Sequence, residues 1–496
     1  MEADGRAEPI ELMESSVRYY SRETNLVFTK GRTIAIKDNI SVGGLPTVFG
    51  TVPQLLSRKS QYPISPIDAS VVSRVLEAGG RVIGTAVCEA YSASPLSFSS
   101  STGPVHNAWA HGMTAGGSSS GCAALLGANV VMKERGDNLG DAVDMALGGD
   151  QGGSIRIPAA YNGIYGMKAT YGLIPFTGVA TLSPMLDHVG PMACNLQDIA
   201  TLLQVLAGYD GIDSRMTPET PLRSQVKDYP TILSDFLSRP LKPEEKLGTP
   251  FKVGLLKESF SVIGMSDQVR DIVQESARKY FSAGGAEVVD ISVPLHKEGP
   301  AIWTAATRAS MADWACAGFL PGYLTYVSPH VSLRWPPDQE MYELFTAANP
   351  SIMNMIFSSI FLKEKWGPQV EAKAHRKVFE LRAAYDEALQ HVDVLITPTI
   401  PSVAMPHPQL TTPDGMRTTI MEKAKVAIGI VANAAPFNVT GHPAMSVPCG
   451  FGTYHDDQMD KSLPVGMQII AKQWDEETIL KVAAVFDAGR GVGNVM

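Results

Sequence analysis

Residues 148–158 read GGDQGGSIRIP, and they overlap the end of the short apolar run VDMALG at residues 143–148. We interpret the apolar run as a buried strand and the residues after it as a glycine-rich turn. Glycine permits backbone angles that other residues avoid, so such a turn can direct several backbone N–H groups toward one point. Working outward, residues 116–121 form a second cluster, GGSSSG. A helix is expected to begin near Ser118 and to run through residues 121–132, with the serines capping its N-terminus.

Signals for strands and helices alternate on both sides of these two turns. Residues 33–40 (TIAIKDNI) alternate and are β-branched, which predicts a strand that runs into a turn. The alternation along the chain predicts an α/β fold with a mostly parallel sheet. Residues 93–117 are expected to form a long loop, and the charged residues 133–141 a surface excursion. Further helices are expected at 9–26, in the first part of 68–92, and at 195–208, 266–284, 367–391 and 476–488; further strands are expected at the end of 68–92 and at 251–258, 286–292, 392–401, 444–451 and 464–471.

One segment, residues 298–366, lacks clean alternation and is rich in Trp, Met, Phe and Tyr. We expect it to form helices that cover the sheet. We also hypothesise that it lines an apolar pocket, because sites for small molecules are lined mostly by apolar side chains. The chain shows no internal repeat and no low-complexity tract. Although 496 residues exceed the usual size of one domain, a large α/β protein can carry one continuous core, so we expect a single domain over residues 1–496.

Composition argues against several classes of function. The net charge is −9 and the pI is about 5.6, whereas a nucleic-acid partner would require a basic face. No run reaches the roughly 18 uninterrupted apolar residues of a membrane helix, and no apolar signal-peptide core follows Met1. The five cysteines have no paired spacing, so neither a disulfide framework nor a zinc site is expected. We therefore predict a cytoplasmic protein.

Lys37 stands at the end of the apolar strand expected at residues 33–40, where a lone lysine is unusual. Together with the two Ser/Gly clusters it suggests acyl transfer. A serine hydroxyl is a poor nucleophile until a base removes its proton, and a buried lysine can be that base because burial lowers its pKa. The glycine turns would supply N–H donors for the oxyanion. Each feature alone has a structural interpretation: a Ser/Gly cluster is usually a flexible loop or a helix cap, and a strand-end lysine is usually solvated.

Taken in this order, the motifs resemble those of the amidase signature family. The resemblance rests on residues 34–40 (IAIKDNI), 116–121 (GGSSSG) and 148–158 (GGDQGGSIRIP). Further agreement is found in YNGIYGMKATYGLIP at 161–175, LDHVGP at 186–191, FNVTGHPAMSVP at 437–448 and LPVGMQII at 463–470. The similar region covers nearly all the chain. It looks most like the branch of stand-alone aliphatic and aromatic amide hydrolases.

The resemblance implies an amidase-signature fold, in which helices cover both faces of a central, twisted, mixed sheet. It implies hydrolysis of a carbon–nitrogen amide bond to a carboxylic acid and ammonia or an amine. The substrate would be a small-molecule amide, with no nucleic-acid or membrane partner. No cofactor and no metal are needed for this reaction. The resemblance also suggests a homodimer.

The resemblance assigns roles residue by residue. Ser154 would be the nucleophile that forms an acyl-enzyme, and Lys37 would be the base. Ser118, following a cis peptide bond, would carry the proton between them. Backbone N–H groups would form the oxyanion hole, and these belong to Gln151, Gly152, Gly153 and Ser154. The residues that would brace the site are Ser119, Asp150 and Arg156.

The chain departs from the family pattern in one respect. Ser118 and Ser154 are 36 positions apart, about a dozen more than is usual in the family. The extra residues fall around 131–141, and we expect them to lengthen a surface loop and to leave the site intact. If they displaced the second turn, Ser154 would lie outside hydrogen-bonding reach of Ser118.

Several alternatives compete with this interpretation. Residues 117–121 also fit the G-x-S-x-G elbow of α/β-hydrolases, with Ser119 as nucleophile and His442 as base, although no strand-like run precedes them. The glycine turns suggest a phosphate cradle, but neither is followed by Lys-Ser or Lys-Thr. Within the family, an ester or carbamate hydrolase and the amidase subunit of a tRNA-dependent amidotransferase are alternatives. His106 and His111 are a weak candidate pair of metal ligands.

Overall fold

The computed structural model describes residues 31–57, 60–136, 143–316, 331, 334–347, 350–409, 418–455 and 460–491. Within them, ten strands form one sheet in the order β2-β1-β3-β5-β4-β9-β10-β8-β6-β7. The strands are β1 (Thr33–Lys37), β2 (Arg81–Ala86), β3 (Met145–Asp150), β4 (Tyr165–Lys168), β5 (His188–Ala193), β6 (Lys252–Leu256), β7 (Glu287–Ile291), β8 (Val394–Pro398), β9 (Ala444–Tyr454) and β10 (Lys461–Ile470). The helix expected at residues 9–26 lies outside the described residues.

The sheet is mixed, as the resemblance implied. Its outer pairs are parallel: β1 pairs with β2 and β3, and β6 pairs with β7 and β8. The pairs between them are antiparallel, from β3–β5 through β4 and β9 to β10–β8. The prediction of a mostly parallel sheet is therefore wrong. It overlooked β4 and β5, whose sequences YGMK and HVGPMA are short and contain glycine or proline in place of a β-branched run.

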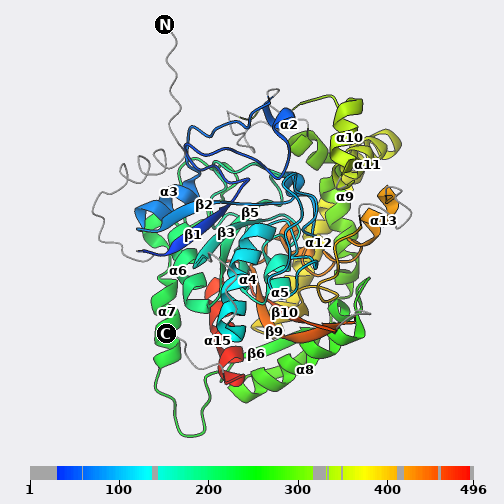
Figure 1. Ribbon diagram of the computed structural model, residues 1–496. Coiled ribbons are helices and arrows are strands. Elements are labelled where there is room, and N and C mark those ends of the chain that lie inside the picture. Colours follow the sequence, from blue (N-terminus) through cyan, green and yellow to red (C-terminus); the bar gives the residue numbers. More distant parts are fainter. Residues whose placement is uncertain are drawn as a thin grey trace.

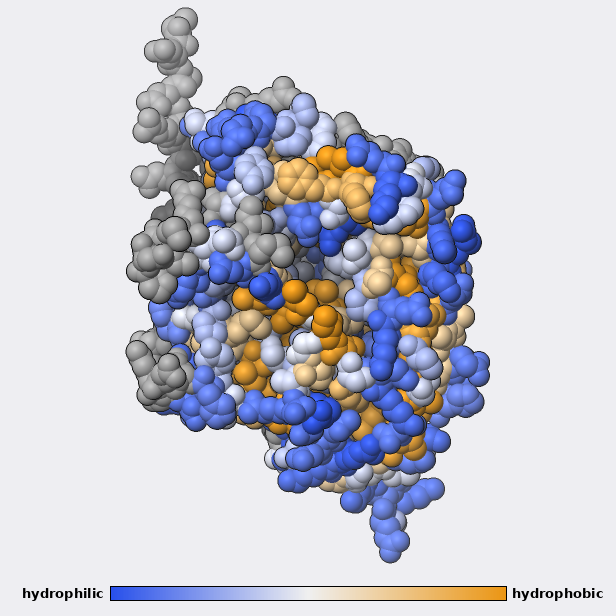
Figure 2. Space-filling model, turned by 90° about the vertical axis from the view of Figure 1, so that its right-hand side faces the viewer, coloured by the Kyte–Doolittle hydropathy of each residue, from blue (hydrophilic) through white to orange (hydrophobic). Residues whose placement is uncertain are grey.

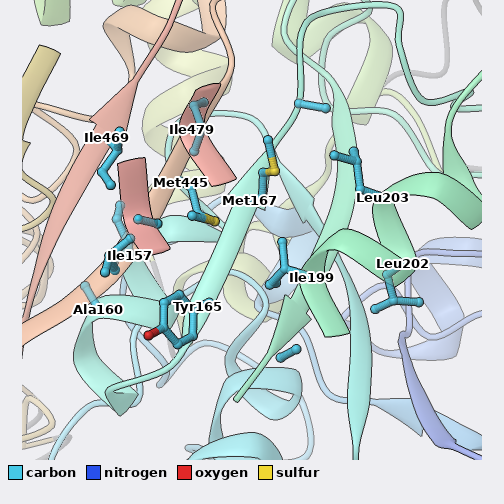
Figure 3. Close-up of a cluster of buried hydrophobic side chains, with 14 of the residues drawn as sticks. Ile157, Ala160, Tyr165, Met167, Ile199, Leu202, Leu203, Met445, Ile469 and Ile479 are labelled. Carbon is cyan, nitrogen blue, oxygen red and sulfur yellow. The ribbon is translucent and has the colours of Figure 1, made fainter. Parts of the chain in front are cut away.

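Helices cover both faces of this sheet (Figure 1). Along β1, Ile34 and Ile36 pack in one cluster with α3 and α6, whereas Ala35 packs in another with α4 and α5. Figure 3 shows part of the first cluster, where Met167 of β4 and Met445 of β9 are drawn with side chains of α6 and α15. The described helices are α2 (Pro53–Ser57), α3 (Ser70–Glu77), α4 (Ser120–Arg135), α5 (Arg156–Asn162), α6 (Leu196–Leu206), α7 (Tyr229–Ser238), α8 (Asp267–Gly284), α9 (Gly299–Met311), α10 (Gln339–Ala347), α11 (Ser351–Trp366), α12 (Gln369–His391), α13 (Ile420–Lys425), α14 (Pro436–Val439) and α15 (Glu476–Gly489).

The start of α4 differs from the expectation. The helix begins at Ser120, and Ser119, which occupies the N-cap position, makes no capping hydrogen bond with its side chain. Its hydroxyl instead lies 3.2 Å from both the backbone nitrogen and the carbonyl oxygen of Gly149. The prediction that the serines cap the helix is wrong, because the hydroxyl of Ser119 ties the helix start to Gly149 near the end of β3.

The end of α4 also differs from the expectation. Residues 133–135 continue the helix, and Gly136 ends it with a φ of 72°. Lysine, glutamate and arginine are good helix formers, and a glycine with positive φ is a common helix stop. The prediction that residues 133–141 form a surface excursion is therefore wrong for residues 133–135, which belong to α4. Residues 137–141 lie outside the described residues.

The described parts of residues 298–366 are largely helical, as expected, and comprise α9, α10, α11 and a π-helical turn at Ala312–Cys316. Their apolar side chains form a packed cluster that includes Met311 and Phe345 and extends to Phe49, Tyr91 and Leu182. Outward-facing apolar side chains remain on α11 and α12, and Figure 2 shows hydrophobic side chains gathered on this side of the molecule. This cluster contains no strand residue, so α10 and α11 pack in a core of their own. Of the described helices of this segment, α9 reaches the sheet, where Ile302 clusters with Leu256 of β6 and Leu395 of β8.

Candidate active site

The strands that lead to the candidate residues are parallel neighbours. Residues 34–36 of β1 pair in register with residues 145–147 of β3. Because parallel strands end at the same edge of a sheet, Lys37 at the end of β1 comes next to the glycine turn that follows β3. The turn before α4 contributes Ser118, and the turn before α5 contributes Ser154.

Lys37 is fully buried beside Ser118. Its Nζ lies 2.8 Å from Ser118 Oγ and 3.3 Å from the carbonyl oxygen of Gly149, and it donates hydrogen bonds to both. Burial lowers the pKa of Lys37 from its ordinary value of 10.5; neighbouring thiol and carboxyl groups act in the opposite direction without outweighing burial. A lysine in these surroundings can lose its proton and then accept one from the serine hydroxyl it touches.

Ser118 is held by its backbone. The Gly117–Ser118 peptide bond is cis, as the resemblance implied. The N–H of Gly117 donates to the carbonyl oxygen of Pro95 at 2.9 Å, and the carbonyl oxygen of Ser118 accepts from the N–H of Glu89 at 3.1 Å. A Cβ atom on Gly117 would lie 2.5 Å from the carbonyl oxygen of Ser94, so only glycine fits at that position.

The two serine turns are joined directly. The backbone N–H of Ser119 donates to the carbonyl oxygen of Ser154 at 3.2 Å. The two turns therefore stay in contact despite the additional residues between them. Among the described residues no hydrogen bond joins the hydroxyl groups of Ser118 and Ser154, so the proton path between them stays a prediction. Ser154 is 8% exposed, whereas Lys37, Ser118 and Ser119 are completely buried. Of these four residues, Ser154 is the one that a reagent from solvent reaches first.

Asp150 and Arg156 form a buried ion pair under the turn that carries Ser154. Arg156 Nη2 lies 2.9 Å from Asp150 Oδ1, and Arg156 Nε lies 3.0 Å from Asp150 Oδ2; both side chains are fully buried. Burial by itself would raise the pKa of Asp150, but the charge and hydrogen bonds of Arg156 and a hydrogen bond from Asn438 lower it below its ordinary value. Arg156 Nη1 also donates a hydrogen bond to the carbonyl oxygen of Ala434. The ion pair therefore links the turn to the residues before α14.

The turn itself uses the freedom of glycine at one position. Gly153 has a φ of 123°, and a Cβ atom there would lie 2.6 Å from the side chain of Ile157. Its N–H donates to Asp150 Oδ1 at 2.8 Å. The expected oxyanion role of the Gly153 N–H is therefore not favoured by the geometry, since this donor is already directed at a carboxylate. Gln151, Gly152 and Ser154 remain as candidate oxyanion donors.

Trp303 of α9 lies against this turn, and no motif in the sequence indicated it. Its indole Nε1–H donates to the carbonyl oxygen of Gln151 at 3.0 Å. A Cβ atom on Gly152 would lie 3.1 Å from the indole ring, so the ring covers the glycine directly. Both polar atoms of the Gln151 side chain are buried without a partner among the described residues. The helical covering segment thus forms one wall beside the turn.

Glu89 is a second residue that the sequence did not indicate. Its carboxylate accepts hydrogen bonds from the N–H and hydroxyl of Ser99 and from the hydroxyl of Ser120 at 2.9 Å. Burial raises the pKa of Glu89 to about 7, although these hydrogen bonds act to lower it. Because its backbone N–H also holds the carbonyl oxygen of Ser118, Glu89 links the turn before α4 to the loop that follows β2.

The structure argues against the elbow alternative. The hydroxyl of Ser119 is engaged by the backbone of Gly149, and the residues directly before it form no strand. The two ring nitrogens of His442 instead lie 3.0 Å from Thr440 Oγ1 and 3.0 Å from Asp386 Oδ1. The Ser119–His442 arrangement that such an elbow requires is therefore not formed.

His106 and His111 do lie together, and His407 joins them. The ring centroids of His106 and His111 are 3.9 Å apart, and those of His106 and His407 are 5.1 Å apart. No group of three or more His, Cys, Asp or Glu residues in the described part of the chain is arranged to hold a metal ion. Among the same residues, no helix is both long enough and apolar enough to cross a bilayer.

Known proteins resemble this chain over most of its length. A family model described as Amidase matches residues 13–480. An enantioselective amidase of Rhodococcus rhodochrous is 34% identical over 469 residues, which cover 94% of this chain and 80% of that protein. The A subunit of glutamyl-tRNA(Gln) amidotransferase from Synechococcus sp. (strain CC9605) is 31% identical over 459 residues, covering 92% and 82%. The solved structure of the same type of amidotransferase subunit from Thermotoga maritima has a like fold, with a TM-score of 0.67 at 24% identity over 92% of this chain and 83% of that one.

Proposed function

This chain belongs to the amidase family of carbon–nitrogen hydrolases, and we propose that it cleaves a linear amide of a small molecule to a carboxylic acid and ammonia or an amine. One observation carries the proposal: Lys37 Nζ lies 2.8 Å from Ser118 Oγ in a fully buried site. The turn that contains Ser118 is joined to the turn that contains Ser154 by a backbone hydrogen bond. This arrangement supports a base, a proton relay and a nucleophile without a histidine.

The first chemical step is acylation of Ser154. Neutral Lys37 accepts the proton of the Ser118 hydroxyl, and Ser118 accepts that of Ser154 as Ser154 Oγ attacks the amide carbon. The carbonyl oxygen becomes an oxyanion, for which the backbone N–H groups of Gln151, Gly152 and Ser154 are the donors. The protonated Lys37 then returns its proton through Ser118 to the amide nitrogen, and the carbon–nitrogen bond breaks.

The second step releases the acid. A water molecule gives a proton toward Lys37 through Ser118 while its oxygen attacks the ester carbonyl on Ser154. The tetrahedral intermediate again uses the same N–H groups, and its collapse returns the proton to Ser154 Oγ and frees the carboxylic acid. The Asp150–Arg156 pair, together with Ser119, keeps the turn in place through both steps.

A second candidate function stays within the family. The Synechococcus amidotransferase protein is 31% identical to this chain, so a role as the amidase subunit of such an enzyme is the runner-up. Release of ammonia from glutamine only after a partner protein is added would favour it. Hydrolysis of esters or carbamates is a further alternative, since both react through the same acyl-enzyme.

The experiment measures ammonia released from acetamide, benzamide and phenylacetamide by the purified full chain. We expect the two aromatic amides to react faster than acetamide, because the covering helices α9 to α11 are apolar on their inner side. Ser154→Ala and Ser118→Ala should each lower kcat by about a thousandfold or more, and Ser234→Ala, at an exposed serine of α7, should leave it unchanged. Ammonia release that persists in Ser154→Ala would contradict the proposal, and equal rates on acetamide and phenylacetamide would contradict the apolar pocket.

We also propose that the protein works as a cytoplasmic homodimer. All five cysteines lie in the described residues and are free thiols, which suits a reducing compartment. Sedimentation at twice the chain mass of 53.1 kDa is expected, and sedimentation at 53.1 kDa would contradict the dimer.

A further inference from the structure

One wall of the proposed site is the helix α9, which belongs to the segment of residues 298–366 and lies beside α11 and α12 (Figure 1). Trp303 on this helix touches the turn through its hydrogen bond to the carbonyl oxygen of Gln151 and through its ring on Gly152. Arg308 follows Trp303 by five residues, and its guanidinium carbon lies 5.8 Å from the centroid of the Trp303 ring. The guanidinium group is thus one side chain away from the turn that carries Ser154.

Arg308 differs from the other arginines buried in this protein. It is part-buried, yet no carboxylate oxygen among the described residues lies within 4.0 Å of it, and it donates no hydrogen bond to any of them. Arg156 pairs with Asp150 and Arg215 pairs with Asp213. Arg74 donates to backbone carbonyl oxygens. A buried charge is normally paired, because an unpaired one loses hydration without compensation.

The electrostatics agree with the contacts. Burial lowers the pKa of Arg308, and no neighbouring acid acts in the opposite direction. A guanidinium group stays protonated in proteins even so, and it therefore remains a positive charge that an anion can neutralise. The Arg308 side chain is only part-buried, so part of its surface is open to solvent.

We propose that Arg308 binds a carboxylate of the substrate, so that the natural substrate is an amide that carries a carboxylate group apart from the bond that is cut. The inference rests on the function proposed above. A planar guanidinium group matches a carboxylate with two parallel N–H···O hydrogen bonds. The ring of Trp303 supports the guanidinium group through a cation–π contact and presents an apolar surface between the carboxylate site and the turn. Trp303 and Arg308 would together fix how far the carboxylate lies from the amide.

The test compares matched substrates. On the acyl side, 4-carbamoylbenzoate is paired with 4-methylbenzamide, and on the amine side, 4-acetamidobenzoate is paired with 4-methylacetanilide. In each pair a methyl group replaces the carboxylate at the same position. For at least one pair, kcat/KM for the carboxylate should exceed kcat/KM for the methyl compound by about 10- to 100-fold in the wild-type protein.

The variants separate recognition from folding. Arg308→Gln should lower this ratio of kcat/KM values to within about threefold of unity, mainly through a higher KM, and Arg308→Lys should restore part of it because the charge returns without the planar fork. Arg376→Gln removes the same charge from an exposed position on α12 and should leave the ratio as in the wild type. Thermal melts of the three variants check that each is folded.

Three outcomes are decisive. A carboxylate preference in one pair that Arg308→Gln abolishes supports the inference. Equal kcat/KM values within both pairs, or a preference that survives in Arg308→Gln, overturns it. Labelling of Ser154 by a fluorophosphonate distinguishes this result from a failure of the proposed function: labelled protein without a carboxylate preference refutes only the role of Arg308, whereas protein that is neither labelled nor active on any amide refutes the hydrolase mechanism.

Discussion

At the scale of single residues, Lys37 and Arg156 are buried cations of the candidate site that have different surroundings. Arg156 is held by two hydrogen bonds to the carboxylate of Asp150. Lys37 donates only to neutral oxygens, those of Ser118 and Gly149. A carboxylate partner offsets the cost of burying a charge, whereas neutral oxygens offset much less of it. This contrast supports the bracing role proposed for Arg156 and the role of base proposed for Lys37.

The pH dependence of activity follows from Lys37. Burial lowers its pKa, and only the neutral amine accepts a proton from Ser118. We therefore expect kcat/KM to rise with pH along a limb whose midpoint lies below 10.5, the ordinary value for lysine. Lys37→Arg should lower kcat/KM by about a thousandfold or more, since a guanidinium group keeps its proton. Initial rates on one amide from about pH 5 to about pH 10 check both points, and a Lys37→Arg protein within tenfold of wild-type activity would refute the assignment.

A pH dependence of stability follows from Glu89. Its pKa is about 7 in the folded protein and 4.5 ordinarily, so between these values the folded state binds more protons than the unfolded state. Stability from this group is complete below pH 4.5 and is lost as the pH rises through about 7. The Gln side chain of Glu89→Gln is neutral at every pH. As the pH rises from 4.5 to about 7, this variant should therefore gain stability relative to the wild type, by roughly 1.4 kcal/mol for each unit of pKa shift.

Thermal melts of wild type and Glu89→Gln at several pH values measure this change. Burial also raises the pKa values of Asp38 and Asp187 to about 6. Both residues are present in the wild type and in the variant, so their contributions to the pH dependence cancel in the comparison. A difference in melting temperature that stays constant with pH would show that Glu89 is ionised in the folded protein.

At the scale of elements, the site depends on where strands end and helices begin. The ends of β1 and β3 supply Lys37 and the glycine turn, and the turns before α4 and α5 supply Ser118 and Ser154. The hydrogen bond from Ser119 to Ser154 fixes the two helix starts against each other. A substitution that shifts one of the two turns should therefore also shift the other turn and lower the activity of the site.

Arg156→Met tests this dependence. It leaves Asp150 as a buried carboxylate without its cation, which typically costs about 3–5 kcal/mol of stability. We expect a lower melting temperature and the loss of amide hydrolysis. Arg270→Met removes an arginine of similar size from an exposed ion pair on α8 and should change stability by less than about 1 kcal/mol. Equal melting temperatures for the two variants would contradict the bracing role of the Asp150–Arg156 pair.

Local patterns predicted some elements of this chain and not others. β1 and β8 have the β-branched, apolar sequences TIAIK and VLITP, and both were predicted. β4 and β5 lack such runs and form because neighbouring strands pair with them, which no local pattern can indicate. For the site, the motifs predicted Lys37 and Ser118 as neighbours. They did not predict Trp303, whose hydrogen bond to Gln151 spans 152 residues of sequence.

At the scale of the whole molecule, one sheet joins the two halves of the sequence. β4 from the first half pairs with β9 from the second, and the cluster of buried side chains crosses this boundary. We propose that residues 1–496 are a single domain. Far-UV circular dichroism and tryptophan fluorescence should then report one thermal transition at the same temperature. Two separated transitions would contradict the single domain.

The central claim is that Ser154 is a nucleophile activated by Lys37 through Ser118. The most direct test is to treat the full chain with a fluorophosphonate and to map the modified peptide by mass spectrometry. The account predicts a mass increment on the peptide that carries Ser154, which is 8% exposed, and the loss of this increment in Lys37→Ala and Ser118→Ala. No label on folded protein, a label on Ser119, or full labelling of Ser154 in Lys37→Ala would contradict it.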